Sequence, residues 1–153
     1  MSSVTQQNPV RIFVSHVWQT TDEYHRIFEY LESSHNFFYV NCSKPEEFPT
    51  GGPDAMRQAA HAEIEACEVL IVPCSLWSRE REWVNFHLKT AKELDRPVIV
   101  LETFGVKEKI PAQLQALGDE IVEWNERSLV DAIKRQARHE ETTRWDVIEF
   151  KLD

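Results

Sequence analysis

The chain has 153 residues, 42% of them apolar, which is enough for one well-buried core but short for two ordinary domains. Its formal net charge of -9 repels phosphate backbones and anionic lipid, so a nucleic-acid or membrane-surface role is not expected. No window approaches the roughly 18 uninterrupted apolar residues of a membrane span. The three cysteines form no C-x-x-C pair. We therefore predict one cytoplasmic domain with reduced cysteines and no zinc site.

Strand and helix patterns alternate from the N-terminus onward. After a polar leader (residues 1–9), the β-branched and aromatic run VRIFVS (10–15) predicts a strand. TTDEYHRIFEYLESS (20–34) predicts a helix, and NFFYVN (36–41) predicts a second strand. The next segment, CSKPEEFPTGGPD (42–54), holds three prolines and two glycines, which predicts a long loop. Long loops in compact domains are often functional.

The same alternation continues through the middle of the chain. DAMRQAAHAEIEAC (54–67) predicts an amphipathic helix, and VLIVPC (69–74) predicts a strand that is apolar on both faces. A third helix is expected from about Arg79 to Leu94, followed by another doubly buried strand, PVIVLETF (97–104). Strands that are apolar on both faces are typical of the centre of a parallel sheet.

The C-terminal part adds a short strand, EIVEW (120–124), and a helix, ERSLVDAIKRQARHE (126–140). Strands and helices at this spacing favour a doubly wound α/β domain with right-handed crossovers. We expect residues 1–9 to be a disordered leader and residues 10–138 to form the domain. Residues 139–153 would form a C-terminal strap or extra strand, because WDVIEFKLD alternates in polarity, and this strand could pair edges in a homo-oligomer.

Ligands of an open parallel sheet bind beyond the carboxyl ends of its strands, near the point where the strand order reverses. Several polar and aromatic residues follow the predicted strands at that edge and are candidates for contacting a bound cofactor. They are Ser15, His16, Trp18, Asn41, Ser43, Ser75 and Trp77. The third predicted helix begins at the same edge, so its first turns can face the crevice. These turns carry Glu80, Glu82, Trp83 and His87.

Several familiar uses of such a crevice do not fit the sequence. A receiver domain needs a phosphoacceptor aspartate after the third strand, where Pro73 and Cys74 stand. The G-x-G-x-x-G, P-loop and G-x-S-x-G patterns are absent. His61 and Glu65 lie one helical turn apart, but the sequence suggests no third ligand nearby. We therefore predict neither a metal site nor a resident cofactor.

Separated blocks of the sequence resemble one family. These blocks are RIFVSHVW, NCSKP, VLIVPCSLWS, WVNFHLKTAKELDRPVIVL and EIVEWNERSLVDAI. Together they resemble the prokaryotic TIR-like domains that include the TIR proteins of the Thoeris antiphage-defence system, across residues 10–135. The resemblance implies a flavodoxin-like, five-stranded parallel sheet in the order 2-1-3-4-5. It also implies that the loop from Cys42 to Pro53 serves in gating and self-assembly.

The resemblance further implies an activity and a catalytic position. Family members that are enzymes cleave NAD at the nicotinamide bond, using a glutamate four residues after a tryptophan, in a pattern like W-x-x-x-E. Counted from Trp83, that position is His87. A carboxylate there would stabilise the oxocarbenium-like ribose that forms as nicotinamide leaves. A neutral imidazole carries no charge and a protonated one repels this transition state, so the motif is broken at its catalytic position.

Two interpretations remain open. The chain could be an NAD-directed enzyme of defence signalling that makes a linear or cyclic ADP-ribose signal, with Glu80, Glu82 or His87 in place of the missing carboxylate. It could instead be a noncatalytic TIR-like module that binds NAD or an ADP-ribose-type nucleotide, or that assembles with other TIR-like subunits or a downstream effector. In either case, His16 and Trp18 could stack on an adenine or nicotinamide ring.

Overall fold

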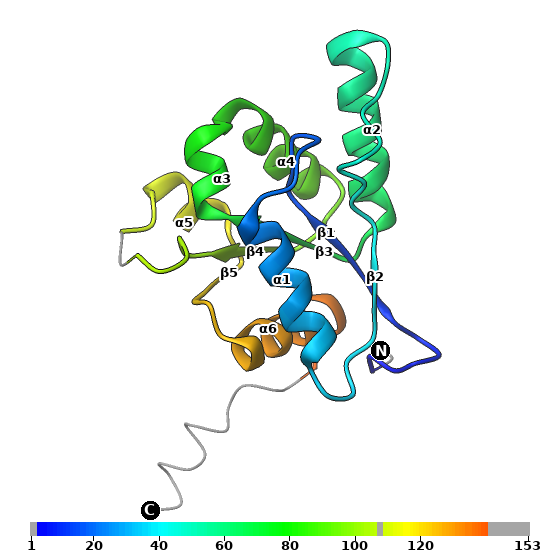
Figure 1. The fold of residues 1–153 in the computed structure, drawn as a ribbon, viewed down its shortest axis with the longest axis vertical. Coiled ribbons are helices and arrows are strands. Elements are labelled where there is room, and N and C mark those ends of the chain that lie inside the picture. The colour runs from blue at the N-terminus through cyan, green and yellow to red at the C-terminus, as the bar shows by residue number, and fades with distance from the viewer. Residues whose placement is uncertain (1–2, 107–108, 141–153) are drawn as a thin grey trace, which may run out of the picture.

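The computed structural model of the protein describes residues 3–106 and 109–140. Within them, five strands form one parallel sheet in the order β2-β1-β3-β4-β5 (Figure 1). The strands are β1 (Val10–Val14), β2 (Tyr39–Asn41), β3 (Val69–Pro73), β4 (Val98–Leu101) and β5 (Glu120–Val122). This arrangement confirms the predicted α/β class and the strand order 2-1-3-4-5.

Six helices connect or follow the strands within the same described ranges. They are α1 (Asp22–Ser33), α2 (Gly52–Ala66), α3 (Cys74–Arg79), α4 (Arg81–Glu93), α5 (Ala112–Leu117) and α6 (Glu126–Arg138). The helix predicted from Arg79 begins instead at Arg81, because the short α3 precedes it and Glu80 leaves helical geometry at φ -126° and ψ 51°. α2 begins two residues before the predicted Asp54, after Gly51 at φ 115°, a conformation that glycine adopts readily.

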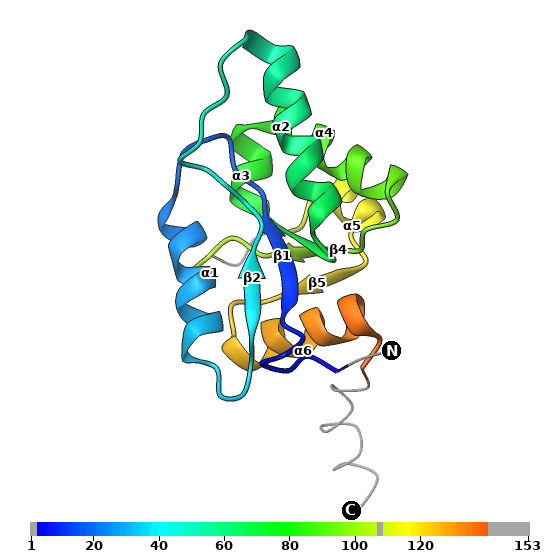
Figure 2. The ribbon, with the colours of Figure 1, turned by 90° about the vertical axis from the view of Figure 1, so that its right-hand side faces the viewer.

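The helices cover both faces of the sheet (Figure 2). α1 and α6 lie on one face, where they pack on strand residues such as Ile12 and Ile71. α2, α3, α4 and α5 lie on the other face, which receives the adjacent strand residues Phe13 and Leu70. Successive strand residues point to opposite faces, so the runs of apolar residues in β1 and β3 follow from a sheet that is buried on both sides.

The strand order reverses at β1, and this fixes the place where a ligand-binding crevice is expected. β1 pairs with β2 on one side and β3 on the other, with Ile12 opposite both Asn41 and Val69. The carboxyl ends of β1 and β3 therefore flank the place where doubly wound sheets bind ligands. β1 leads directly into Ser15 and His16, both of which are buried.

The N-terminal segment is joined to the end of α6 by Arg138. Its guanidinium donates to the Glu68 carboxylate at 2.6 and 3.0 Å. It also donates to the backbone carbonyls of Ser3, Asn8 and Pro9 at 3.2 to 3.4 Å. Residues 3–9, predicted as part of a disordered leader, thus have defined contacts from the third residue onward.

No helix in the described part of the chain is long and apolar enough to cross a membrane. The predicted C-terminal strand WDVIEFKLD (145–153) and its edge pairing lie outside the described residues.

Candidate functional site

Three side chains, two that follow β1 and one on α4, meet at the carboxyl end of β1. Ser15 and His16 follow β1, and each keeps only 2% of its surface exposed. His87, on α4, has no exposed surface, and its Nδ1 lies 3.1 Å from the Ser15 hydroxyl oxygen. The rings of His16 and His87 are 6.4 Å apart between centroids. The structure thus brings together three of the predicted site residues, although Ser15 and His87 lie 72 positions apart in the sequence.

The environment of His87 keeps its imidazole neutral. Burial, and to a smaller extent the nearby His16, lowers the pKa of His87 from 6.5 to about 3. The ring meets Phe13 of β1 edge-on at 5.2 Å, and its Nε2 has no hydrogen-bond partner among the described residues. The side chain that was predicted to face the crevice is therefore enclosed in the core, and its catalytic role stays a prediction.

The two glutamates predicted as replacements lie in a different environment. Glu80 separates α3 from α4, and Glu82 lies in the first turn of α4. Both are exposed, whereas His87 is buried further along the same helix. The structure does not enclose either carboxylate beside the buried imidazole.

Three aromatic side chains cover this region and form what we call the aromatic cluster: Trp18, Phe48 and Trp83. Trp18 is 8% exposed and meets Trp83 edge-on, with centroids 5.6 Å apart. Phe48, from the loop between β2 and α2, lies 5.9 Å from Trp18 and is 64% exposed. Trp18 has a left-handed backbone at φ 58°, which costs a residue other than glycine about 1 kcal/mol or more. Its Nε1 has no hydrogen-bond partner among the described residues.

Sequence reasoning missed a buried carboxylate, Glu63 of α2. It is 7% exposed, and its Oε1 lies 2.8 Å from Nε2 of His16 and accepts the backbone N–H of Lys44 at 2.9 Å. The signal was present in the sequence: Ala60, Glu63, Ile64 and Cys67 fall at the i, i+3, i+4, i+7 spacing of a buried helix face. A glutamate inside such a stripe needs buried partners.

Asn41 and Ser43, predicted from their position after β2, join the following loop to α1. The hydroxyl groups of Tyr24 and Ser43 are 2.9 Å apart, and the Asn41 amide donates to the Tyr24 oxygen at 3.1 Å. The backbone N–H of Ser43 donates to the Asn41 side chain at 2.9 Å. The next residue, Lys44, donates its backbone N–H to Glu63, the carboxylate that also contacts His16. The network around Ser43 is therefore connected to His16 through the backbone of Lys44.

Ser75 and Trp77, the candidates after β3, have other partners. The Ser75 hydroxyl donates to Glu23 of α1 at 2.5 Å, and the same carboxylate accepts the backbone N–H of Phe104 at 3.0 Å. The Trp77 indole N–H donates to the Asn85 side chain at 2.9 Å. The contacts of Ser75 and Trp77 therefore form networks separate from the buried histidines.

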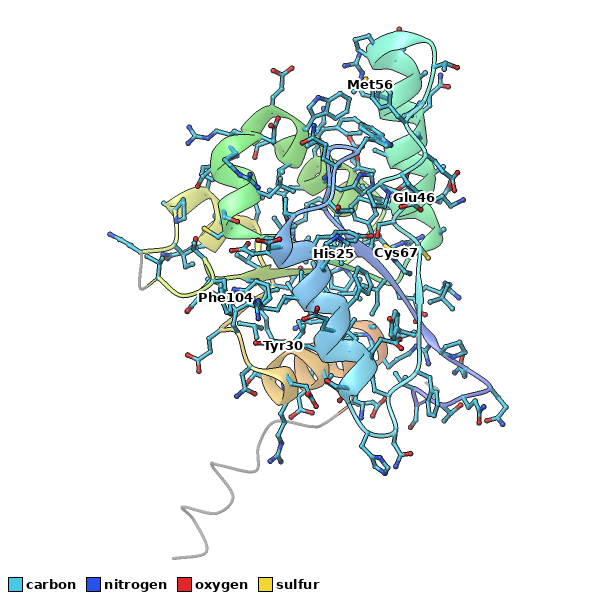
Figure 3. All side chains as sticks on the ribbon, viewed as in Figure 1. His25, Tyr30, Glu46, Met56, Cys67 and Phe104 are labelled. Carbon is cyan, nitrogen blue, oxygen red and sulfur yellow. The ribbon has the colours of Figure 1, made fainter. Side chains whose placement is uncertain are left out.

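The loop after β2, which contributes Phe48 to the aromatic cluster, leads into α2. In Figure 3, Glu46 of the loop lies next to α2 and Met56 marks the end of α2 that extends furthest from the sheet. Among the described residues, no group of three or more histidine, cysteine, aspartate or glutamate side chains is placed to hold a metal ion.

Comparison with known proteins identifies the family. A family model described as "Thoeris protein ThsB, TIR-like domain" matches residues 13–108, more than half of the chain. The chain belongs to this family. The matched range of this TIR-like protein includes the end of β1 and all of α2 and α4, and with them Ser15, His16, Glu63 and His87. A search of curated proteins found no significant match.

Two solved structures have a similar course of the chain. One is a CMP N-glycosidase of Clostridium botulinum, BcmB, at 14% identity and a TM-score of 0.46, covering 80% of this chain and 97% of that one. The other is a de novo designed Rossmann 2x3 fold protein, at 12% identity and a TM-score of 0.49, covering 88% of this chain and 96% of that one.

Proposed function

We propose that this TIR-like protein of the Thoeris family serves antiviral defence as a nucleotide-binding module. Its crevice would take NAD or an ADP-ribose-type nucleotide and leave the bond to nicotinamide intact. The observation that carries the proposal is the state of His87: a neutral, fully buried imidazole stands where the W-x-x-x-E pattern has its carboxylate.

The missing charge bears directly on the chemistry. When nicotinamide leaves NAD, positive charge develops on the ribose, and a fixed carboxylate lowers the energy of that state. The loss of one preorganised electrostatic partner typically costs about 3 to 4 kcal/mol, or about 10² to 10³ in rate. With a pKa of about 3, His87 supplies neither a negative charge nor an efficient base near neutral pH.

Binding is supported by the aromatic cluster and by two polar atoms that lack partners. Trp18, Phe48 and Trp83 offer ring faces and edges of the kind on which a nucleotide base stacks. Nε1 of Trp18 and Nε2 of His87 are buried without hydrogen-bond partners among the described residues, and buried polar atoms of this kind gain from a bound partner. Because Trp18 is 8% exposed, a nucleotide enters only when Trp18 or Phe48 moves aside.

A second candidate function is NAD cleavage with a relocated carboxylate. Glu63 favours it, because this buried acid is hydrogen-bonded to His16 in the same cluster as His87. The exposed Glu80 and Glu82 are weaker candidates, since solvent screens their charge. If the wild-type protein releases nicotinamide, Glu63→Gln, Glu80→Gln and Glu82→Gln identify the carboxylate responsible.

Calorimetry with NAD and with ADP-ribose tests the binding proposal. We expect heat of binding for the wild-type protein and an affinity about tenfold lower for Trp83→Ala, since base stacking on one aromatic ring contributes about 1 to 3 kcal/mol. Trp124→Ala is the matched control, because that indole packs on Tyr30 and Phe104 instead. No heat with either nucleotide would overturn the proposal and leave assembly with a protein partner as the function to test.

A further inference from the structure

The turn that holds Trp18 depends on one nitrogen of His16. The backbone N–H of Trp18 donates to Nδ1 of His16 at 3.1 Å, while Trp18 keeps its left-handed backbone at φ 58°. An atom that accepts this hydrogen bond carries no proton of its own. The ring proton of His16 therefore resides on Nε2.

The carboxylate of Glu63 provides the acceptor for that proton. Nε2 of His16 lies 2.8 Å from Oε1 of Glu63, and both side chains are buried. The other donor to Oε1 is the backbone N–H of Lys44, so α2 is tied to the end of β1 and to the loop after β2 through one oxygen atom. Without Glu63, Nε2–H would be a buried donor lacking its acceptor, and the ring proton would lose the interaction that favours Nε2 over Nδ1.

A proton on Nδ1 would face the N–H of Trp18, and two donors repel each other. Trp18 would then lose the hydrogen bond that offsets its unfavourable backbone conformation. Its indole is the member of the aromatic cluster that contacts both Phe48 and Trp83. The hydrogen bond from the Trp18 N–H to Nδ1 thus links the position of the ring proton on His16 to the position of the Trp18 indole.

We propose that Glu63 is a positioning residue: it fixes the ring proton of His16 on Nε2 and thereby holds Trp18 between Phe48 and Trp83 across the crevice. The ionisable groups that face His16 are Glu63 from α2 and His87 from α4. The importance of this device for ligand entry rests on the proposed nucleotide function. The device itself can be tested without any nucleotide.

Two substitutions at His16 separate its two hydrogen bonds. An asparagine side chain ends near the position of Nδ1 and can accept from Trp18, whereas a glutamine side chain ends near Nε2 and can donate to Glu63. We expect His16→Asn to keep Trp18 covered and His16→Gln to release it. The readout is acrylamide quenching of the Trp18 fluorescence, obtained by subtracting the matching Trp18→Phe protein. Release should raise the quenching constant of Trp18 several-fold.

Substitutions at Glu63 provide a second test of the proposal. Nitrogen NMR of labelled protein should show His16 with its proton on Nε2 in the wild type and in Glu63→Gln, whose amide oxygen still accepts. Glu63→Leu should shift the proton toward Nδ1 and increase Trp18 quenching. A wild-type proton on Nδ1, or equal release of Trp18 by His16→Asn and His16→Gln, would overturn the proposal. Because neither readout uses NAD, failure to bind NAD leaves this test unaffected.

Discussion

Replacing His87 by leucine should change how the stability of the protein depends on pH. The imidazole has a folded-state pKa of about 3 because it is fully buried and lies near His16, whereas its ordinary value is 6.5. As the pH falls below 6.5, His87 becomes protonated in the unfolded chain but stays neutral in the folded protein. His87 therefore leaves stability unaffected above about pH 6.5, and it destabilises the fold progressively between about pH 6.5 and pH 3.

The size of the effect follows from the two pKa values. For a folded-state pKa of about 3, the proton that binds only the unfolded state lowers the free energy of unfolding by roughly 2 kcal/mol between pH 7 and pH 5. Other groups titrate in the same range, so the informative quantity is the difference between the wild type and His87→Leu. Urea unfolding followed by tryptophan fluorescence at the two pH values measures it.

A second substitution on the same helix serves as the control. Val84→Ala removes buried apolar surface from α4 without removing a titrating group, so its destabilisation should be the same at pH 7 and pH 5. His87→Leu, in contrast, should lose about 2 kcal/mol less than the wild type on acidification. Parallel pH profiles for the wild type and His87→Leu would refute the claim that the imidazole is held neutral in the core.

Three further substitutions or reactions test the packing. Arg138→Met should lower the free energy of unfolding by about 3 kcal/mol, because it removes the buried guanidinium and leaves the Glu68 carboxylate with Arg11 alone; a loss below about 0.5 kcal/mol in urea unfolding would contradict the pairing. Gly118→Ala should cost about 1 to 3 kcal/mol, since the new Cβ would lie 2.8 Å from a methyl group of Val100; an unchanged melting temperature would contradict this contact. Burial raises the pKa of the Cys67 thiol to about 12, so Cys67 should resist alkylation until urea unfolds the protein, as peptide mass spectrometry would show; rapid native labelling would contradict its burial.

The sequence was most informative where apolar residues run without interruption. VLIVP and VIVL could be assigned as central strands because only a sheet covered on both faces buries every residue of such a run. α3 and α5 were not predicted because a six-residue helix is too short to show a period. Their positions depend on packing against α4 and the sheet rather than on a local pattern.

The placement of the candidate site residues was predicted in part, for a similar reason. The rule that ligands bind at strand ends located Ser15 and His16, but the rule does not say which polar side chains turn inward. The burial of His87 had a signal, since Val84, His87, Leu88 and Ala91 form the buried stripe of α4. Glu63 occupies the same i+3 place in the stripe of α2. A polar residue in such a stripe has a buried partner that comes from elsewhere in the chain, and the stripe itself does not identify it.

The most direct test of the central claim measures the release of nicotinamide from NAD. The purified protein is incubated with NAD, with and without lysate of phage-infected cells, and the products are separated by chromatography. The proposed function predicts no release by the wild type or by His87→Gln. Restoring the carboxylate in His87→Glu should raise release above that of His87→Gln, by up to about 10² to 10³. Wild-type release that scales with protein concentration would contradict the claim that a buried, neutral His87 has replaced the catalytic charge.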